Sequence, residues 1–166
     1  HGQTWMNMLN STVRAKDDSC LYLSDDCWSN IMNSKFNGGV YIDKKTRTII
    51  QNCTINRMVV INEAKVTMSN STVTAHSDFQ DQSSCEATRV SFMGNMDYEY
   101  FLALSGNANL RGHDLLLHPN GADLAIQDEA KLHTNVIADK GEKLSVECDK
   151  RPNVYMLGVQ WTAKRK

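Results

Sequence analysis

The chain is poor in the residues that interrupt or stiffen a backbone, with two prolines and nine glycines among 166 residues. This scarcity excludes a collagen-like or Pro-rich linker protein. No apolar run approaches the roughly 18 residues that a membrane-spanning helix needs. The first residues lack the charged-then-apolar order of a signal peptide, so we expect any such peptide to have been removed. A single domain is expected from this length.

Charge bias and known catalytic motifs are also lacking. Basic and acidic residues number 18 and 19, so no net charge draws the chain toward nucleic acid. The sequence holds no C-x-x-C pair, no G-x-S-x-G elbow and no glycine-rich phosphate loop. No window repeats apolar residues at helical spacing. We therefore expect an all-β protein without a cofactor, and these motifs identify no catalytic residue and no metal ligand.

Five cysteines are present, at Cys20, Cys27, Cys53, Cys85 and Cys148. The odd number leaves at least one thiol free or paired between chains. Because Cys20 and Cys27 flank a short polar segment, we predict a local disulfide between them, which favours an exported protein. The alternative is two unpaired, partly buried thiols. The pairing of the other three cysteines stays open.

Asparagine-based glycosylation motifs occur three times, at Asn10, Asn52 and Asn70. The chain is rich in asparagine, serine and threonine, so three such motifs are close to the number expected by chance. They therefore carry no prediction about glycosylation.

A short repeat is the most informative feature of the sequence. An alanine followed by an aliphatic residue two or three places later recurs at Ala64, Ala87, Ala108 and Ala130, with spacings of 23, 21 and 22 residues. Short segments between these alanines alternate apolar and polar residues, which is typical of strands. The segments are Val66/Met68, Val73/Ala75, Leu115/Leu117, Leu124/Ile126 and Leu144/Val146.

Three short strands in each turn of about 22 residues predict a parallel β-helix of about five coils. The aliphatic side chains would stack inside, and the polar residues between them would face solvent. The outward set is Lys65, Thr67, Asn109, Arg111, Lys131 and His133. The alternative is an antiparallel β-sandwich, for which Asn37-Gly38-Gly39 and Asn120-Gly121 are credible hairpin turns.

The expected organisation is a single domain in three parts. Residues 1–37 lack the repeat and are predicted to form an N-terminal cap, with a short helix from Ser29 to Phe36. Residues 38–157 form the coils, and residues 158–166 form a tail in which Trp161 closes the other end. Residues 76–86 and 95–100 break the rhythm and are predicted to project as loops.

Over about residues 40–157 the rhythm resembles the right-handed parallel β-helix of pectin-lyase-like proteins and bacterial autotransporter passengers. The resemblance implies an exported, surface-associated, non-enzymatic binding or adhesion module. Its partner would be a host-surface glycan or protein, with no nucleic acid and no transmembrane segment. Candidate contact residues are Thr67, Thr74 and His76, together with the 76–86 loop.

A carbohydrate-active enzyme is the alternative function, so enzymatic activity stays open. A small β-helix lyase or hydrolase would need paired carboxylates in a groove. A copper oxidase is the other form, because His1-Gly2 resembles the mature start of lytic polysaccharide monooxygenases. Such a site needs a second histidine, from His76, His113, His118 or His133.

Overall fold

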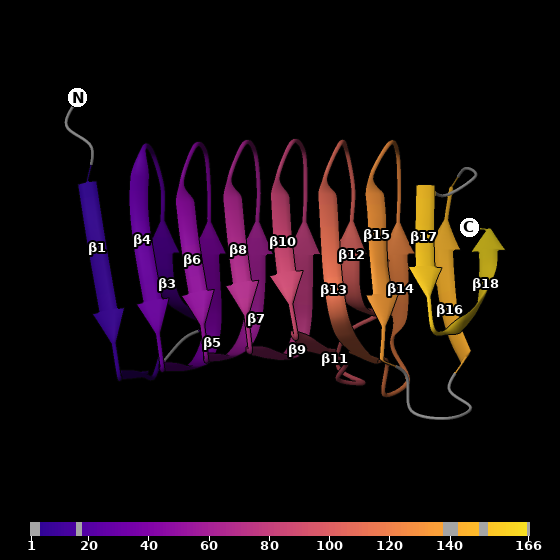
Figure 1. Ribbon diagram of the computed structural model, residues 1–166, viewed down its shortest axis with the longest axis horizontal. Coiled ribbons are helices and arrows are strands. Elements are labelled where there is room, and N and C mark those ends of the chain that lie inside the picture. Colours follow the sequence, from indigo (N-terminus) through magenta and orange to yellow (C-terminus); the bar gives the residue numbers. More distant parts are fainter. Residues whose placement is uncertain (1–3, 16–17, 138–142, 150–152, 166) are drawn as a thin grey trace.

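The computed structural model describes residues 4–15, 18–137, 143–149 and 153–165. The described residues form 18 strands and no helix, and every pair of neighbouring strands is parallel. The strands wind into about eight stacked coils (Figure 1). The prediction of a parallel β-helix is confirmed. The sandwich alternative fails because it requires antiparallel pairs.

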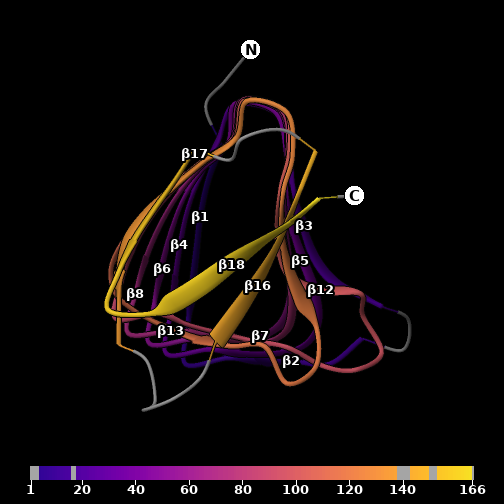
Figure 2. The same ribbon diagram turned by 90° about the vertical axis from the view of Figure 1, so that its right-hand side faces the viewer.

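The winding is right-handed. In Figure 1 the chain descends along β4, β6 and β8 on the near side, rises along the far side, and advances toward the C-terminus with each coil. Seen along the axis in Figure 2, each coil is a triangle with three strand-bearing faces. No described helix could serve as a membrane span.

The three faces follow one another in the same order in each complete coil. Face 1 contains β1 (Thr4–Leu9), β4 (Cys27–Met32), β6 (Arg47–Gln51), β8 (Lys65–Ser69), β10 (Ser84–Thr88), the start of β13 (Asn109–His118), β15 (Lys131–Val136) and β17 (Asn153–Leu157). Face 2 contains β2 (Thr12–Val13), the starts of β5 (Lys35–Ile42), β7 (Thr54–Val60) and β9 (Thr72–Phe79), then β11 (Ser91–Met93) and the end of β13. Face 3 contains β3 (Ser19–Leu23), the ends of β5, β7 and β9, then β12 (Tyr100–Leu104), β14 (Asp123–Ile126), β16 (Lys143–Cys148) and β18 (Gln160–Arg165).

The core consists of columns of inward side chains. On face 1, Val66, Cys85, Leu110 and Leu132 are in register on four successive coils and are buried. All five alternating segments expected from the sequence point their apolar residues inward. At the end of β15, Val136 is buried in the core, whereas the next residue, Ile137, is 52% exposed.

The number and length of the coils differ from the expectation of five coils of 22 residues. In-register partners are 18 residues apart at Arg47 and Lys65 but 25 apart at Ser84 and Asn109. Ala87 therefore does not share a register with Ala64, Ala108 and Ala130. It lies within β10, opposite Met68.

A column of small buried side chains marks the turn corner, which we define as the turns between face 3 and the next face 1 strand. In each of five turns the N–H of the small residue donates to the carbonyl oxygen three residues earlier, which closes a tight turn. These residues are Thr46, Ala64, Ser83, Ala108 and Ala130, each at most 1% exposed. Ser83, and not Ala87, is the missing member of the repeat.

The opposite corner, between faces 1 and 2, carries an asparagine ladder. Asn10, Asn33, Asn52 and Asn70 occupy equivalent positions with φ between 48° and 53°. Asparagine tolerates this left-handed conformation better than most residues. Arg89 and Asp114 continue the column at φ 52° and 55°.

The residue after each asparagine points inward and bonds the backbone. The Ser34 hydroxyl accepts from the N–H of Ser11 and donates to the carbonyl of Met32. The Ser71 hydroxyl does the same with Cys53 and Ser69. The three glycosylation-like triplets are thus copies of one structural corner, which is why they recur.

Residues 4–15 and 18–32 are part of the solenoid, so the prediction of a non-repeating cap over residues 1–37 is not what the structure shows. β1 and β4 pair along their full lengths. The expected helix from Ser29 to Phe36 is instead β4, a corner and the start of β5. The repeat was hidden because serine and methionine replace aliphatic residues in the inward positions here, as at Met6 and Ser29.

The predicted 76–86 loop is also wrong. Residues 76–79 belong to β9 and residues 84–86 to β10, with the tight turn at 80–83 between them. The projection expected at 95–100 is found between β11 and β12, where the turn residues 95–97 are exposed. This insertion lengthens its coil to the 25-residue spacing.

The two ends of the solenoid differ. Residues 160–165 form β18, which pairs with β16 and crosses the triangular opening in Figure 2, so this part of the expected tail is a strand. Trp161 packs partly buried against the core, as predicted. At the other end Met6 and Met8 face the core but are only partly buried.

Candidate functional site

Outward side chains on face 1 form straight rows across the coils. Alternation along each strand sends every second residue outward, and parallel pairing places equivalent residues about 4.8 Å apart on neighbouring coils. The first row is Trp5, Trp28, Arg47, Lys65, Ser84, Asn109, Lys131 and Asn153. The second row is Asn7, Asn30, Ile49, Thr67, Glu86, Arg111, His133 and Tyr155.

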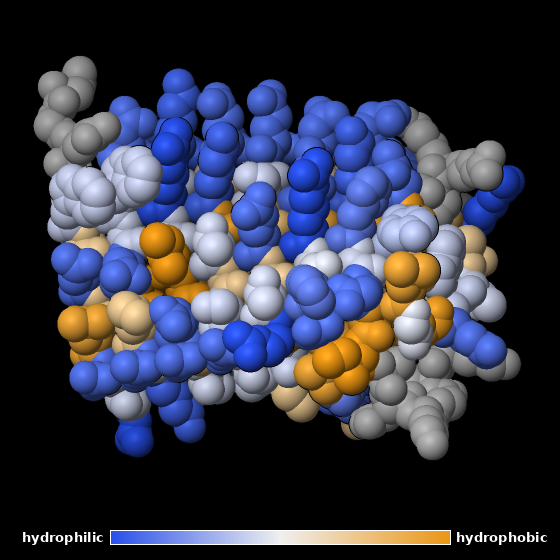
Figure 3. Space-filling model, viewed as in Figure 1, coloured by the Kyte–Doolittle hydropathy of each residue, from blue (hydrophilic) through white to orange (hydrophobic). Residues whose placement is uncertain are grey.

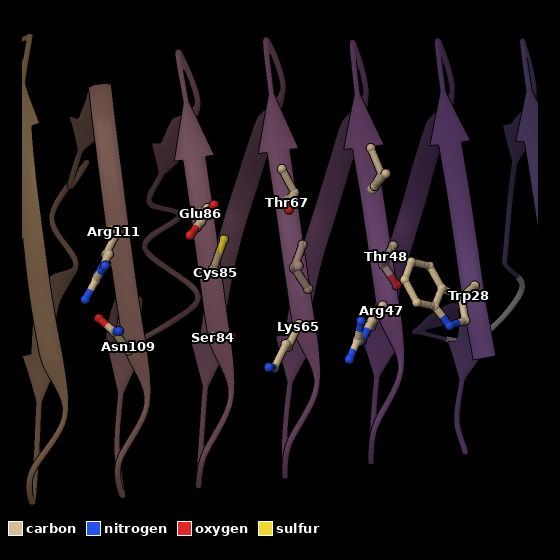
Figure 4. A pocket seen from close by; sticks show the side chains of 12 residues that line it. Trp28, Arg47, Thr48, Lys65, Thr67, Ser84, Cys85, Glu86, Asn109 and Arg111 are labelled. Atoms are coloured by element: carbon tan, nitrogen blue, oxygen red, sulfur yellow. The ribbon is translucent and has the colours of Figure 1, made fainter. Parts of the chain in front are cut away.

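The middle of these rows is hollowed into a shallow groove of about 560 Å³, which we call the face 1 groove. It crosses β4, β6, β8, β10 and β13 (Figure 4). Figure 3 shows mostly hydrophilic side chains over this face, with small apolar areas among them. Outward residues that line the groove are Trp28, Arg47, Ile49, Lys65, Thr67, Ser84, Glu86, Asn109 and Arg111.

An aromatic and cationic stack closes one end of the groove. The rings of Trp5 and Trp28 lie 5.3 Å apart at 24°. The guanidinium carbon of Arg47 lies 4.9 Å from the centre of the Trp28 ring, in a cation–π contact. The stack holds Arg47 in place at the groove and leaves Trp5 67% exposed.

The polar residues expected outside are found there. Lys65, Thr67, Arg111, Lys131 and His133 are exposed, and Asn109 is half-buried. No salt bridge joins Lys65, Arg111 or Lys131 to an acid within the described part of the chain. Their charges are therefore available to a ligand.

The structure does not bring the three predicted contact residues together. Thr67 lines the face 1 groove. Thr74 lies on β9 where face 2 bends into face 3, and its hydroxyl bonds the carbonyl of Ile55 at 3.4 Å and the amide oxygen of Asn56 at 3.3 Å. Thr74 and Thr67 thus belong to different sides of the triangle.

His76 is 9% exposed and lies under the projecting loop. Its Nδ1 lies 2.6 Å from the carbonyl oxygen of Tyr100, and its ring stacks on Tyr98 at 5.3 Å. The aromatic residues of the loop thus pack against the solenoid. A contact role for Thr74 and His76 stays a prediction, separate from the groove.

A pair of carboxyl groups meets at the base of the same loop. The Tyr100 hydroxyl lies 2.9 Å from Oε1 of Glu99 and 2.7 Å from Oε1 of Glu147. Glu147 comes from β16, which is 47 residues further along the chain than Tyr100. Sequence spacing alone gave no signal for this approach.

Trp28, Arg47 and Ile49 line the groove but were not predicted from the sequence as outward or contact residues. All three precede Ala64, where the recognised alanine repeat begins. Their register with Lys65 would have revealed Trp28 and Arg47, because Trp28, Arg47 and Lys65 occupy the same position on three successive coils.

All five cysteines are described, and all are free thiols. Cys20 lies on face 3 with its sulfur near the carbonyl of Val13, whereas Cys27 begins β4 on face 1 and points into the core. The predicted disulfide between them is therefore not formed. The support for export that rested on it is removed.

Burial raises the pKa of the Cys27, Cys53 and Cys85 thiols above the ordinary value. Cys85 is the most strongly affected, by burial first and by the neighbouring Glu86 carboxylate second. These three side chains are core residues, and none is an activated nucleophile.

The described residues contain no cluster of three or more His, Cys, Asp or Glu side chains that could hold a metal ion. His1, on which the copper hypothesis depends, lies outside the described residues. The hypothesis is therefore not tested by the geometry.

No family model matches the chain, and no curated protein and no solved structure resembles it significantly.

Proposed function

We propose that the protein is a non-enzymatic binding module that holds an extended glycan in the face 1 groove. The observation that carries the proposal is the set of in-register rows. Cations and short hydroxyl and amide side chains recur along five coils, and one tryptophan stack lies at the end of the groove. Cation and polar donors at fixed spacing suit a repeating chain of hydroxylated units. We further propose that the ligand is displayed on a host cell surface and that the protein acts outside the cell.

A glycan fits this surface better than a folded protein does. The centre of a protein interface is depleted in charged residues and enriched in aromatic residues. The centre of the groove instead holds Lys65, Thr67 and Glu86. The strands of face 1 are also paired on both sides between β4 and β15, so their backbone cannot take up a further strand.

A glycan-binding screen tests the proposal, with affinities then measured by titration calorimetry. Replacing Trp28 with alanine should weaken binding at least about fivefold, because the stack that holds Arg47 is lost. Thr67→Val should also weaken binding, whereas the matched Thr74→Val should leave it unchanged. The proposal is wrong if no glycan binds, or if Thr74→Val alone reduces binding.

A carbohydrate-active enzyme is a second candidate, favoured by the meeting of Glu99 and Glu147 at the Tyr100 hydroxyl. A glycosidase requires two carboxyl groups that flank the bond it cleaves; here Glu99 is exposed and Glu147 is buried beside it. Release of new reducing ends from a polysaccharide, abolished in Glu147→Gln and retained in Thr67→Val, would support this candidate. Unchanged polysaccharide after long incubation would reject hydrolysis.

A further inference from the structure

We infer that the ligand of the face 1 groove is an acidic glycan, one that carries carboxylate or sulfate groups along its chain. The inference rests on the proposed function and adds the chemical class of the ligand. A neutral glycan would need the hydroxyl and amide groups of the groove but would leave its cations without partners.

The charge of the face supports this inference. Four cations follow the outward rows, and we call them the basic strip: Arg47, Lys65, Arg111 and Lys131. Glu86 is the one acid among the outward residues that line the groove. The whole chain has one more acid than base, so the basic strip is a local excess.

Apart from Glu86, the acidic residues nearest in sequence to the basic strip lie at the corners of the coils. Asp114 lies three residues after Arg111, at the corner between faces 1 and 2, where its carboxylate accepts from the side-chain amide of Asn135. At the turn corner Asp25 pairs with Lys44, and the Asp81 carboxylate accepts from the N–H of Asn62. An anionic chain that follows the strip would lie on the face and away from these corners.

The basic strip is long enough to contact several units of a polymer, and it runs along the solenoid axis. Its cations come from the third, fourth, sixth and seventh coils, so at about 4.8 Å per coil they span about 19 Å along the axis. In Figure 4 Arg47 and Lys65 lie side by side on neighbouring strands, and Arg111 lies at the far end. A ligand that meets all four cations must run across the strands, parallel to the solenoid axis.

Nucleic acid also carries regular negative charge but suits the groove less well. Proteins that bind single strands stack the bases on free aromatic faces. Here Trp28 is covered by Trp5 on one side and by Arg47 on the other. Between the cations lie Thr67, Ser84 and Asn109, which are hydrogen-bonding groups without a stacking surface.

A matched set of polymers tests the inference with the intact chain. Neutral dextran, carboxymethyl dextran and dextran sulfate share one backbone and differ in charge. We expect binding of the two charged forms at least about tenfold tighter than that of dextran at low salt, with the advantage falling as salt screens the strip. Equal affinity for all three would overturn the inference and leave the proposed function standing. Binding of none of the three, and of no glycan in the screen, would remove both.

Single substitutions locate the effect. Lys65→Gln and Arg111→Gln should each weaken binding of dextran sulfate about threefold to fivefold, and the pair together by roughly tenfold or more. Glu86→Gln should strengthen it about twofold, because a repulsive charge is removed. Lys35→Gln is the matched control, since Lys35 is an exposed lysine on face 2.

Two further outcomes decide against the inference. If Lys35→Gln weakens binding as much as Lys65→Gln does, the attraction is not specific to the groove. If single-stranded poly(dT) displaces dextran sulfate more efficiently per charge than carboxymethyl dextran does, the groove prefers nucleic acid. Circular dichroism of each variant confirms that the solenoid is intact, and the gain expected in Glu86→Gln cannot arise from misfolding.

Discussion

The side-chain amide of Asn52 donates a hydrogen bond of 3.1 Å to Oδ1 of Asn33 on the preceding coil. Asn33 donates in turn to Asn10, also at 3.1 Å. Each asparagine thus bonds its neighbour and also adopts a left-handed backbone that most residues avoid. Two independent contributions to stability therefore coincide at one exposed position.

Replacing Asn33 separates these contributions. Asn33→Ala loses both ladder hydrogen bonds and strains the backbone at φ 52°, so we expect a loss of about 2 kcal/mol in the free energy of unfolding. Asn33→Gly loses the same two hydrogen bonds, but glycine adopts the left-handed conformation without strain. We therefore expect a loss of only about 1 kcal/mol. Urea denaturation measures both. Equal losses for the two variants would show that backbone strain contributes nothing.

Packing in the core predicts a larger effect at Phe92. Its side chain is fully buried, and its ring meets Phe79 edge to face, with centres 6.5 Å apart at 81°. Phe92→Ala should destabilise the fold by about 3–5 kcal/mol because a cavity remains. Met96→Ala, at a side chain that is 84% exposed, should change stability by less than about 0.5 kcal/mol. Similar midpoints for the two variants in denaturation would contradict this packing.

Asp43 makes the stability of the fold depend on pH in the acidic range. Burial alone would raise the pKa of Asp43, but hydrogen bonds from Asn62, Tyr22 and the Lys44 backbone outweigh burial and lower it. The carboxylate therefore stabilises the fold at pH values above the ordinary carboxyl pKa of about 3.9. This contribution is lost as the pH falls through the lowered pKa of the folded state. The stability gap between wild type and Asp43→Asn should be widest near neutral pH and shrink below about pH 4. A gap that stays constant between about pH 7 and about pH 3 would contradict this role of Asp43.

Cys85 makes the stability of the fold depend on pH in the alkaline range. Burial raises the pKa of its thiol in the folded state, so the unfolded chain loses this proton first as pH rises. The contribution of Cys85 to the free energy of unfolding is full at pH values below the ordinary thiol pKa of about 8.5, and it declines at higher pH. Denaturation midpoints of wild type should fall between pH 8 and 10 more steeply than those of Cys85→Ala. Parallel slopes, or rapid labelling of Cys85 by a thiol reagent in the native protein, would refute its burial.

The sequence was sufficient for the fold where the core is aliphatic. Leu110, Leu124 and Leu132 recur at the three-strand rhythm, and alternation correctly assigned Lys65 and Arg111 to the outside. The period was misjudged because Ala87 matched the pattern by coincidence. Its true counterpart is Ser83, a small residue that fills the same column without being apolar.

Only part of the candidate site could be predicted from the sequence. Thr67 was singled out, and it lies in the groove. Trp28 and Arg47 were not, because the first three coils place Met6, Ser29 and Thr48 in one inward column, and these residues are not recognisable as a hydrophobic repeat. The closeness of Glu147 to Tyr100 depends on how β16 meets β12 and β14 in space. No local pattern contains that information.

The unequal ends of the solenoid have a consequence for how it comes apart. Each coil contacts its immediate neighbours, so stability is a sum of adjacent terms along one dimension. Among the described residues, Met6 and Met8 of the first coil are only partly buried, whereas β18 and Trp161 pack over the last coil. Opening should therefore begin at β1 and travel like a zipper, and hydrogen exchange at backbone amides should slow progressively from the first coil toward the middle of the molecule.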